Sequence, residues 1–112
     1  MLENDLIIKI KNQAIDVTFE EVMQVINDNY LYTPTSFVNG TLDNQASTNE
    51  GSCKIFYFAK LHGLSQEQTL NCFGHYYRDD VLGNPTAADH GNIRNFINSG
   101  WPGIQFPSQV LR

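Results

Sequence analysis

The sequence of 112 residues lacks the features that mark several classes of protein. It has no run of about 18 apolar residues, the length that a membrane-spanning helix needs, and it does not open with the charged and apolar segments of a cleaved signal peptide. Basic residues are few, since seven Lys and Arg stand against twelve Asp and Glu, for a net charge of −5. They are also scattered along the chain, so we expect neither nucleic-acid binding nor membrane binding.

Cysteine is scarce as well, with only Cys53 and Cys72 in the chain. Small secreted scaffolds that rely on disulfides normally carry more cysteine than this. Both residues also lie inside apolar helical patterns, which favours reduced, buried thiols. No His-x-x-x-His pair and no cluster of cysteines is present, so the sequence predicts no metal site and no cofactor.

Aromatic residues, in contrast, are plentiful: seven Phe, five Tyr and one Trp. A chain of this length forms one domain, residues 1–112, and buries about two-thirds of the surface that the unfolded chain exposes. The longest segment dominated by apolar residues is Gly51–Leu61. We interpret it as an interior helix around which the rest of the chain is organised, with Cys53 in its first turn.

Local signals predict where the other helices begin and end. An amphipathic helix is expected over Leu2–Asn12, and Thr18 and Ser65 are each followed three residues later by Glu or Gln, the spacing of a capping box. The helix after Ser65 is expected to run without a break, with one apolar stripe along it. That stripe consists of Leu70, Phe73, Tyr77 and Val81.

The last helix is predicted to start at Asp89 as its N-cap and to end at Gly100. Gly74 lies inside the preceding helical pattern, where glycine costs about 1 kcal/mol relative to alanine. We expect this glycine to permit the close approach of another helix.

Strand signals are confined to two short regions. Asn39-Gly40 favours the positive φ angles of a tight hairpin turn, and β-branched and aromatic residues stand on either side of it. Residues 103–106 alternate weakly and are predicted to add a third strand beside this hairpin. The fold class that follows is α+β: a mainly helical single domain of about five helices with a small antiparallel sheet.

Several ordered phrases of the sequence resemble the HopJ type III effector family. The similarity runs from about Phe19 to the C-terminus. The phrases that carry it are Tyr32–Gly40, Asn49–Phe56, Phe73–Leu82, Asp89–Phe96 and Gly100-Trp101. This resemblance implies a small bacterial protein, located in the bacterial cytoplasm or secreted into a host cell by a type III system. It implies no particular reaction and no catalytic residues.

One function hypothesis is enzymatic and centres on Cys53. A cysteine in the first turn of a helix lies near free backbone N–H groups, which stabilise the thiolate and lower the thiol pKa. The general base would then be His90 or His75, in a small cysteine-dependent hydrolase or transferase. The structural alternative is that Cys53 is a small core residue and His90 a surface or capping histidine.

The other hypothesis, which we place first, is a non-enzymatic protein-binding module that acts as a monomer on an unidentified protein partner. Its surface is expected between the region 39–52 and the region 78–90. The predicted binding residues are Asn39, Gly40, Arg78, Asp79 and Trp101. The structural alternative for Arg78 is that its stem lies on neighbouring rings and its guanidinium pairs with a nearby carboxylate or helix C-terminus.

Overall fold

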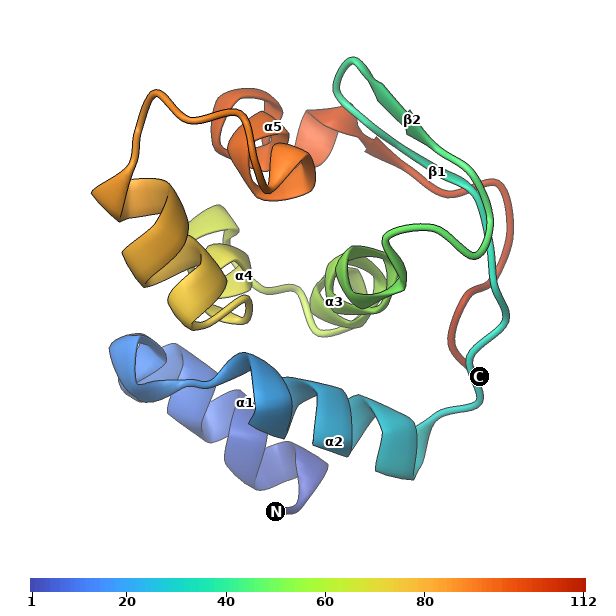
Figure 1. Ribbon diagram of the computed structural model, residues 1–112. Coiled ribbons are helices and arrows are strands. Elements are labelled where there is room, and N and C mark those ends of the chain that lie inside the picture. The colour runs from blue at the N-terminus through green and yellow to red at the C-terminus, as the bar shows by residue number, and fades with distance from the viewer.

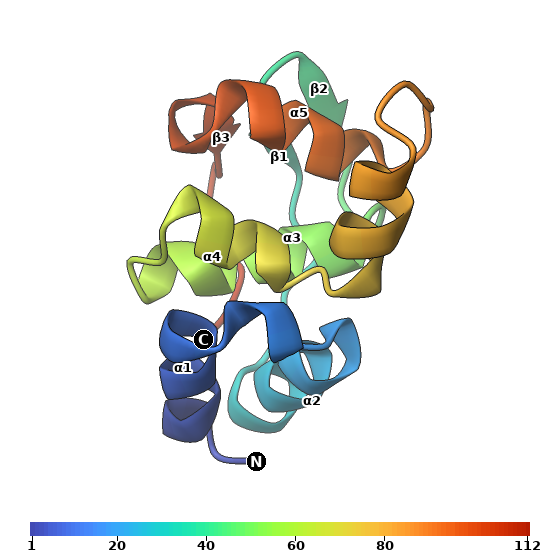
Figure 2. The same cartoon turned by 90° about the vertical axis from the view of Figure 1, so that its left-hand side faces the viewer.

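The structure, a computed structural model, describes residues 1–112 and stacks its elements in three layers (Figure 1). The lowest layer contains α1 (Glu3–Asn12) and α2 (Phe19–Asn29), and the middle layer contains α3 (Glu50–Leu61) and α4 (Gln66–Asn71). Above them lie α5 (Gly91–Ser99) and the sheet, as the view turned by 90° also shows (Figure 2). The predicted fold class, mainly helical α+β with a small antiparallel sheet, is confirmed.

The sheet has three short antiparallel strands, β1 (Phe37–Asn39), β2 (Leu42–Asn44) and β3 (Ile104–Gln105), in the order β2-β1-β3. The predicted hairpin joins β1 to β2, but its turn lies one residue later than expected: Asn39 belongs to β1 and pairs with Leu42. Of the two predicted turn residues, only Gly40 has a positive φ, +61°. The third strand expected near residues 103–106 pairs with β1. Both strand predictions are therefore confirmed.

The middle of the molecule is filled by α3, as its apolar sequence predicts. Phe56 is fully buried, and its ring lies 4.9 Å from that of Phe96, 5.4 Å from Phe73 and 6.1 Å from Phe37, measured between centroids. Phe56 thus connects α3 to the sheet, to the segment after α4 and to α5. One hydrophobic cluster of 23 buried residues extends from these contacts through all three layers.

Both predicted capping boxes are formed. The Thr18 hydroxyl accepts a hydrogen bond from the Glu21 backbone N–H at 3.1 Å, and the Glu21 carboxylate accepts one from the Thr18 backbone N–H at 2.7 Å. Ser65 and Gln68 make the same reciprocal pair at the start of α4. Each box satisfies backbone donors that a helix start otherwise leaves free.

The prediction of one unbroken helix after Ser65 is wrong. The α-helix α4 ends at Asn71, and the chain turns at Gly74 before it continues as the π-helix η2 (Tyr76–Val81). Gly74 has φ +60°, and a Cβ at this position would lie 2.7 Å from the backbone nitrogen of Phe19. The expected close approach therefore exists, but it is made by the first residue of α2 and it coincides with the break.

The predicted N-cap of the last helix is wrong by one residue. The N-cap is His90, which adopts the left-handed conformation with φ +52°, and it caps with no side-chain hydrogen bond. Asp89 is instead held by Arg94, whose Nη2 lies 2.7 Å from Asp89 Oδ1. This hydrogen bond lowers the pKa of Asp89 and keeps its carboxylate away from the first backbone N–H groups of α5.

Candidate functional site

A cavity of about 530 Å³ opens where the first turns of α3 and α5 meet the start of α2 and the π-helix η2. Three aromatic side chains form part of its wall: Phe19, Phe73 and Tyr76. Polar side chains form another part: Asn49, Ser52, His90 and Asn92. The lining contains no Asp, Glu, Lys or Arg.

The aromatic part of the wall depends on the break at Gly74. Tyr76 is the first residue of η2, and its ring packs edge-on against Phe19 with centroids 5.1 Å apart. The ring of His90 lies 5.4 Å from the ring of Tyr76. Because the turn redirects the chain after α4, Tyr76 reaches both the start of α2 and the start of α5.

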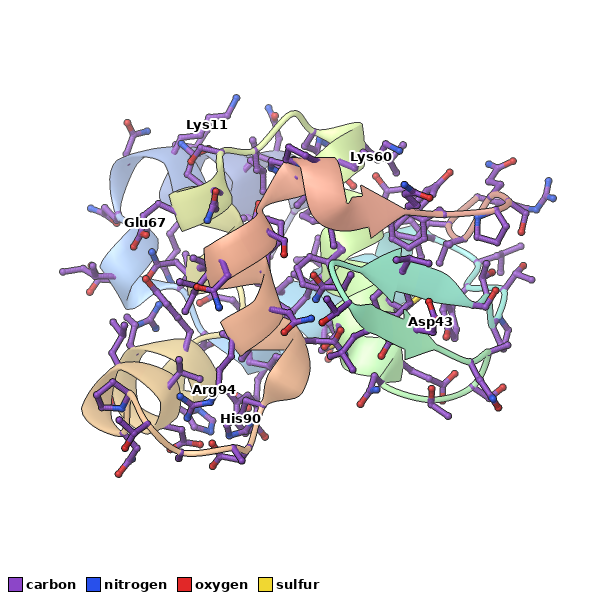
Figure 3. The ribbon with its side chains drawn as sticks, turned by 90° about the horizontal axis from the view of Figure 1, so that it is seen from above. Lys11, Asp43, Lys60, Glu67, His90 and Arg94 are labelled. Atoms are coloured by element: carbon purple, nitrogen blue, oxygen red, sulfur yellow. The ribbon has the colours of Figure 1, made fainter.

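His90 is fixed in the cavity by its backbone and by Asp80. Its Nε2 lies 3.0 Å from Asp80 Oδ2, and Figure 3 shows His90 on the loop that leads into α5. A carboxylate only accepts hydrogen bonds, so this contact places the proton on Nε2 and leaves Nδ1 as an acceptor in the neutral ring. His90 thus adds an oriented ring with a hydrogen-bonding atom to the wall.

A network of four asparagines, three of them buried, ties both helix starts to the hairpin. Asn92, in the first turn of α5, donates to Asn44 Oδ1 at 2.9 Å and accepts from Asn39 Nδ2 at 3.0 Å. Asn49, the N-cap of α3, donates to the same Asn44 oxygen at 2.8 Å. A buried network of this kind holds the cavity wall in one arrangement, because breaking it would leave buried amide groups without partners.

The N-cap residues of α3 and α5, which both lie at the cavity, share an unusual backbone conformation. Asn49 and His90 both adopt the left-handed conformation, with φ of +50° and +52°, and neither side chain caps its helix. Backbone N–H groups of the first turns are therefore free to donate. Together with Ser52, the lining can donate hydrogen bonds to acceptor groups while its rings contact apolar surface.

Cys53 lies in the first turn of α3 but does not line this cavity. It is fully buried, and its Sγ donates a weak hydrogen bond to the Thr35 carbonyl oxygen at 3.6 Å. Burial raises the pKa of the Cys53 thiol to about 11, so the lowered pKa that its helix position predicts is not found. Cys72 is also buried, and burial raises its pKa to about 12.

Both thiols of the native protein are therefore expected to resist alkylation. At pH 8 the folded chain should take up no iodoacetamide at Cys53 or Cys72, because a raised pKa and full burial remove both thiolate and access. In urea both should react. Mass spectrometry of the labelled chain measures this, and selective labelling of native Cys53 near pH 6 would instead favour the enzymatic hypothesis.

Of the predicted binding residues, Arg78 makes extensive internal contacts. Its Nη1 donates to Asn71 Oδ1 at 2.9 Å and to the Ala14 carbonyl at 3.2 Å, and its Nη2 donates to the Val17 carbonyl. This guanidinium joins η2 to α4 and to the segment before α2, as the structural alternative describes. Asp79, its neighbour, is exposed.

The remaining predicted binding residues lie away from the cavity lining. Asn39 is fully buried in the asparagine network, and Gly40 forms the hairpin turn. Trp101 packs edge-on against Phe96 and donates its indole N–H to the Leu64 carbonyl at 3.1 Å. The broader predicted surface does contain the cavity, since the region 39–52 supplies four lining residues and the region 78–90 supplies His90.

Sequence reasoning did not assign Phe19 or Phe73 to a site. Phe19 and Phe73 were expected to form apolar faces of their own helices, and nothing local indicates that these segments meet. One usable signal was Gly74 between aromatic residues, because a glycine inside a helical pattern marks either a break or a close backbone approach.

Fold and cavity together define a small, mainly helical α+β domain with a cavity lined by aromatic and polar side chains. The family model described as HopJ type III effector protein matches residues 3–111, so the chain belongs to the HopJ family. A crystal structure of VPA0580, titled as a protein of unknown function, superposes with a TM-score of 0.98. It is 46% identical, and the match covers 100% of this chain and 93% of that one. A search of curated proteins gives no match.

The description of the family names a type III effector protein. None of the helices combines the length and the apolar character that crossing a bilayer requires.

Proposed function

We propose that this HopJ-family protein is a non-enzymatic binding protein and that the cavity between α3 and α5 takes a side chain from a segment of a partner protein. The observation that carries this proposal is the cavity itself. It has about 530 Å³ of space, and it combines three aromatic rings with hydrogen-bonding groups. Mixed cavities of this size are where proteins bind ligands and partner side chains.

The lining also limits what can enter. Because no Asp or Glu lines the cavity, an inserted ammonium would find no carboxylate of the lining to pair with. Burying such a charge without a partner is costly. The proposed occupant is an apolar or aromatic side chain, which packs against Phe19, Phe73 and Tyr76. An acceptor atom on it would meet the Ser52 hydroxyl and the free N–H groups of the helix starts.

The alternative, a hydrolase or transferase with Cys53 as nucleophile and His90 as base, has less support. It requires an accessible thiolate beside the histidine, whereas Cys53 is buried and hydrogen-bonded to Thr35. His90 lies in the cavity lining and Cys53 does not. The family description supports delivery by a type III apparatus, in which case the partner is a host protein.

Site-specific photo-crosslinking tests the binding proposal. A diazirine analogue of leucine replaces Leu42, which lines the cavity, and in a matched control it replaces Leu31, which is 75% exposed and lines none of the four main cavities. The analogue has nearly the shape of leucine, so the cavity stays open. Irradiation in cells is expected to couple one discrete protein to the chain labelled at Leu42.

Comparison with the Leu31 control shows whether the coupled protein occupies the cavity. The same partner should be absent, or several-fold weaker, from the chain labelled at Leu31, because only a cavity occupant lies within the short reach of the diazirine at Leu42. Equal coupling from both positions, or coupling from neither, would contradict the proposed site.

A further inference from the structure

A second surface lies on the outer side of α3, around Lys60, and shares no residue with the cavity described above. Two hollows flank this lysine. One, of about 300 Å³, includes Leu64, Trp101 and Ile104 in its wall, and the other, of about 490 Å³, includes Tyr57, Phe106 and Pro107. Lys60 belongs to the wall of both.

The aromatic side chains of these walls are held in place by the fold. Trp101 packs edge-on against Phe96 with centroids 5.2 Å apart, and its indole N–H is hydrogen-bonded to Leu64. Tyr57 and Phe106 pack edge-on at 5.1 Å. All three wall aromatics remain partly exposed. Rigid, partly exposed aromatics of this kind carry much of the energy at protein interfaces.

Lys60 is a cation without an internal partner. Lys9 pairs with Glu21 at 2.9 Å and Lys54 donates to Asn27 at 3.0 Å, but Lys60 makes no hydrogen bond and no ion pair. Its Nζ lies 5.9 Å from the centroid of the Phe106 ring. Figure 3 shows Lys60 beside β3, well apart from the labelled carboxylates. The charge on this face is therefore available to a carboxylate from outside.

We propose that this surface docks an extended segment of a partner protein in which an acidic residue stands between two apolar ones. A segment that fills both hollows has to cross Lys60, because this lysine forms the wall that they share. In an extended chain every second side chain points to the same face. The pattern is thus apolar, any residue, acidic, any residue, apolar, with the acid paired to Lys60.

The only tryptophan of the chain lies in this surface, so its fluorescence reports binding directly. The full-length protein is titrated with the capped peptide Leu-Ser-Glu-Ser-Leu. Two control peptides are Leu-Ser-Gln-Ser-Leu, which lacks the charge, and Glu-Ser-Leu-Ser-Leu, which has the same composition in another order. The first peptide should give a saturable change, and each control should bind about fivefold more weakly.

Variants of the protein test the role of the lysine. Lys60→Glu is expected to weaken the binding of the acidic peptide by about tenfold, because it replaces an attraction by a repulsion. Lys11→Glu, an equal change of charge on α1, should alter it less than about twofold, since Lys11 lines neither hollow. Lys60→Gln provides the same test without a new charge, should Lys60→Glu fold poorly.

Three results would overturn the proposal: no saturable response of Trp101 to the acidic peptide, equal affinity for the reordered peptide, or unchanged affinity in both Lys60 variants. A Ser52→Tyr chain, in which the cavity between α3 and α5 is filled, should bind this peptide as the unmodified protein does. Loss of peptide binding in that variant would show that the peptide occupies the cavity and would also overturn the proposal.

Discussion

Replacement of Phe56 by alanine is expected to lower the free energy of unfolding by about 3–5 kcal/mol, as for other fully buried phenylalanines. Its ring contacts three other buried rings, one each from the sheet, the segment after α4 and α5. The cavity left behind would thus lie where the layers meet and could not be filled by one local shift. Because small domains have only about 5–15 kcal/mol of stability in total, this variant should be largely unfolded at moderate urea concentration.

Urea unfolding followed by circular dichroism measures this loss. The matched control is Leu61→Ala on the same helix, since Leu61 is 51% exposed. It should change the free energy of unfolding by less than about 1 kcal/mol, as surface substitutions usually do. Similar losses in the two variants would contradict the interpretation of α3 as the central helix of the core.

Gly74→Ala is expected to cost about 2–4 kcal/mol, from two sources. An alanine in the left-handed region costs about 1–2 kcal/mol, and the new methyl group would lie 2.7 Å from the Phe19 backbone nitrogen, which cannot move aside as a flexible side chain can. The substitution should also displace Tyr76 from Phe19 and so distort the proposed binding cavity.

Two other glycines separate these contributions. Gly63 has φ +63° with no atom near its hypothetical Cβ, so Gly63→Ala should show the conformational cost alone, about 1–2 kcal/mol. Gly83 has neither a positive φ nor a close neighbour, so Gly83→Ala should be neutral or stabilise by up to about 1 kcal/mol. Thermal unfolding measures all three. A Gly74→Ala loss no larger than that of Gly63→Ala would show that the approach of α2 does not matter.

Much of the fold could be predicted because its signals are local. Thr18 and Ser65 lie three residues from the side chains that complete their capping boxes, and Gly40 supplies the positive φ of the hairpin turn. The apolar segment from Gly51 to Leu61 was long enough to identify the core helix from composition alone. In each case the chemistry that decides the structure lies within one helical turn or one hairpin.

The wrong predictions concern residues whose conformation is set by contacts with distant parts of the chain. The helical periodicity continues through Gly74, and only the approach of Phe19, 55 positions earlier in the chain, makes that site a left-handed turn. Asp89 is a good N-cap by residue type, yet Arg94 holds its carboxylate and the helix begins after His90. No sequence pattern at Arg94 or Phe19 indicates that these residues make these contacts.

The candidate cavity was beyond sequence reasoning for the same reason. Its wall joins Phe19, Ser52, Tyr76 and His90, which come from four segments of the chain. Sequence patterns identified the two regions that face each other, but not the aromatic residues between them. The asparagines that fix the wall could not be recognised either, because the hydrogen bonds of Asn92 with Asn39 and Asn44 cross 48 or more positions of sequence.

The most direct test of a binding function for this cavity is to fill it. Ser52→Tyr places a ring in the cavity at a residue whose hydroxyl makes no hydrogen bond, and Asn4→Tyr places the same ring on the exposed face of α1. Calorimetric titration measures the affinity of each variant for the protein that crosslinks at Leu42. The affinity of Ser52→Tyr should be at least about tenfold weaker than that of the unmodified chain, because the variant loses one well-buried contact. Asn4→Tyr should bind as the unmodified chain does, whereas full affinity in a folded Ser52→Tyr chain would contradict the account.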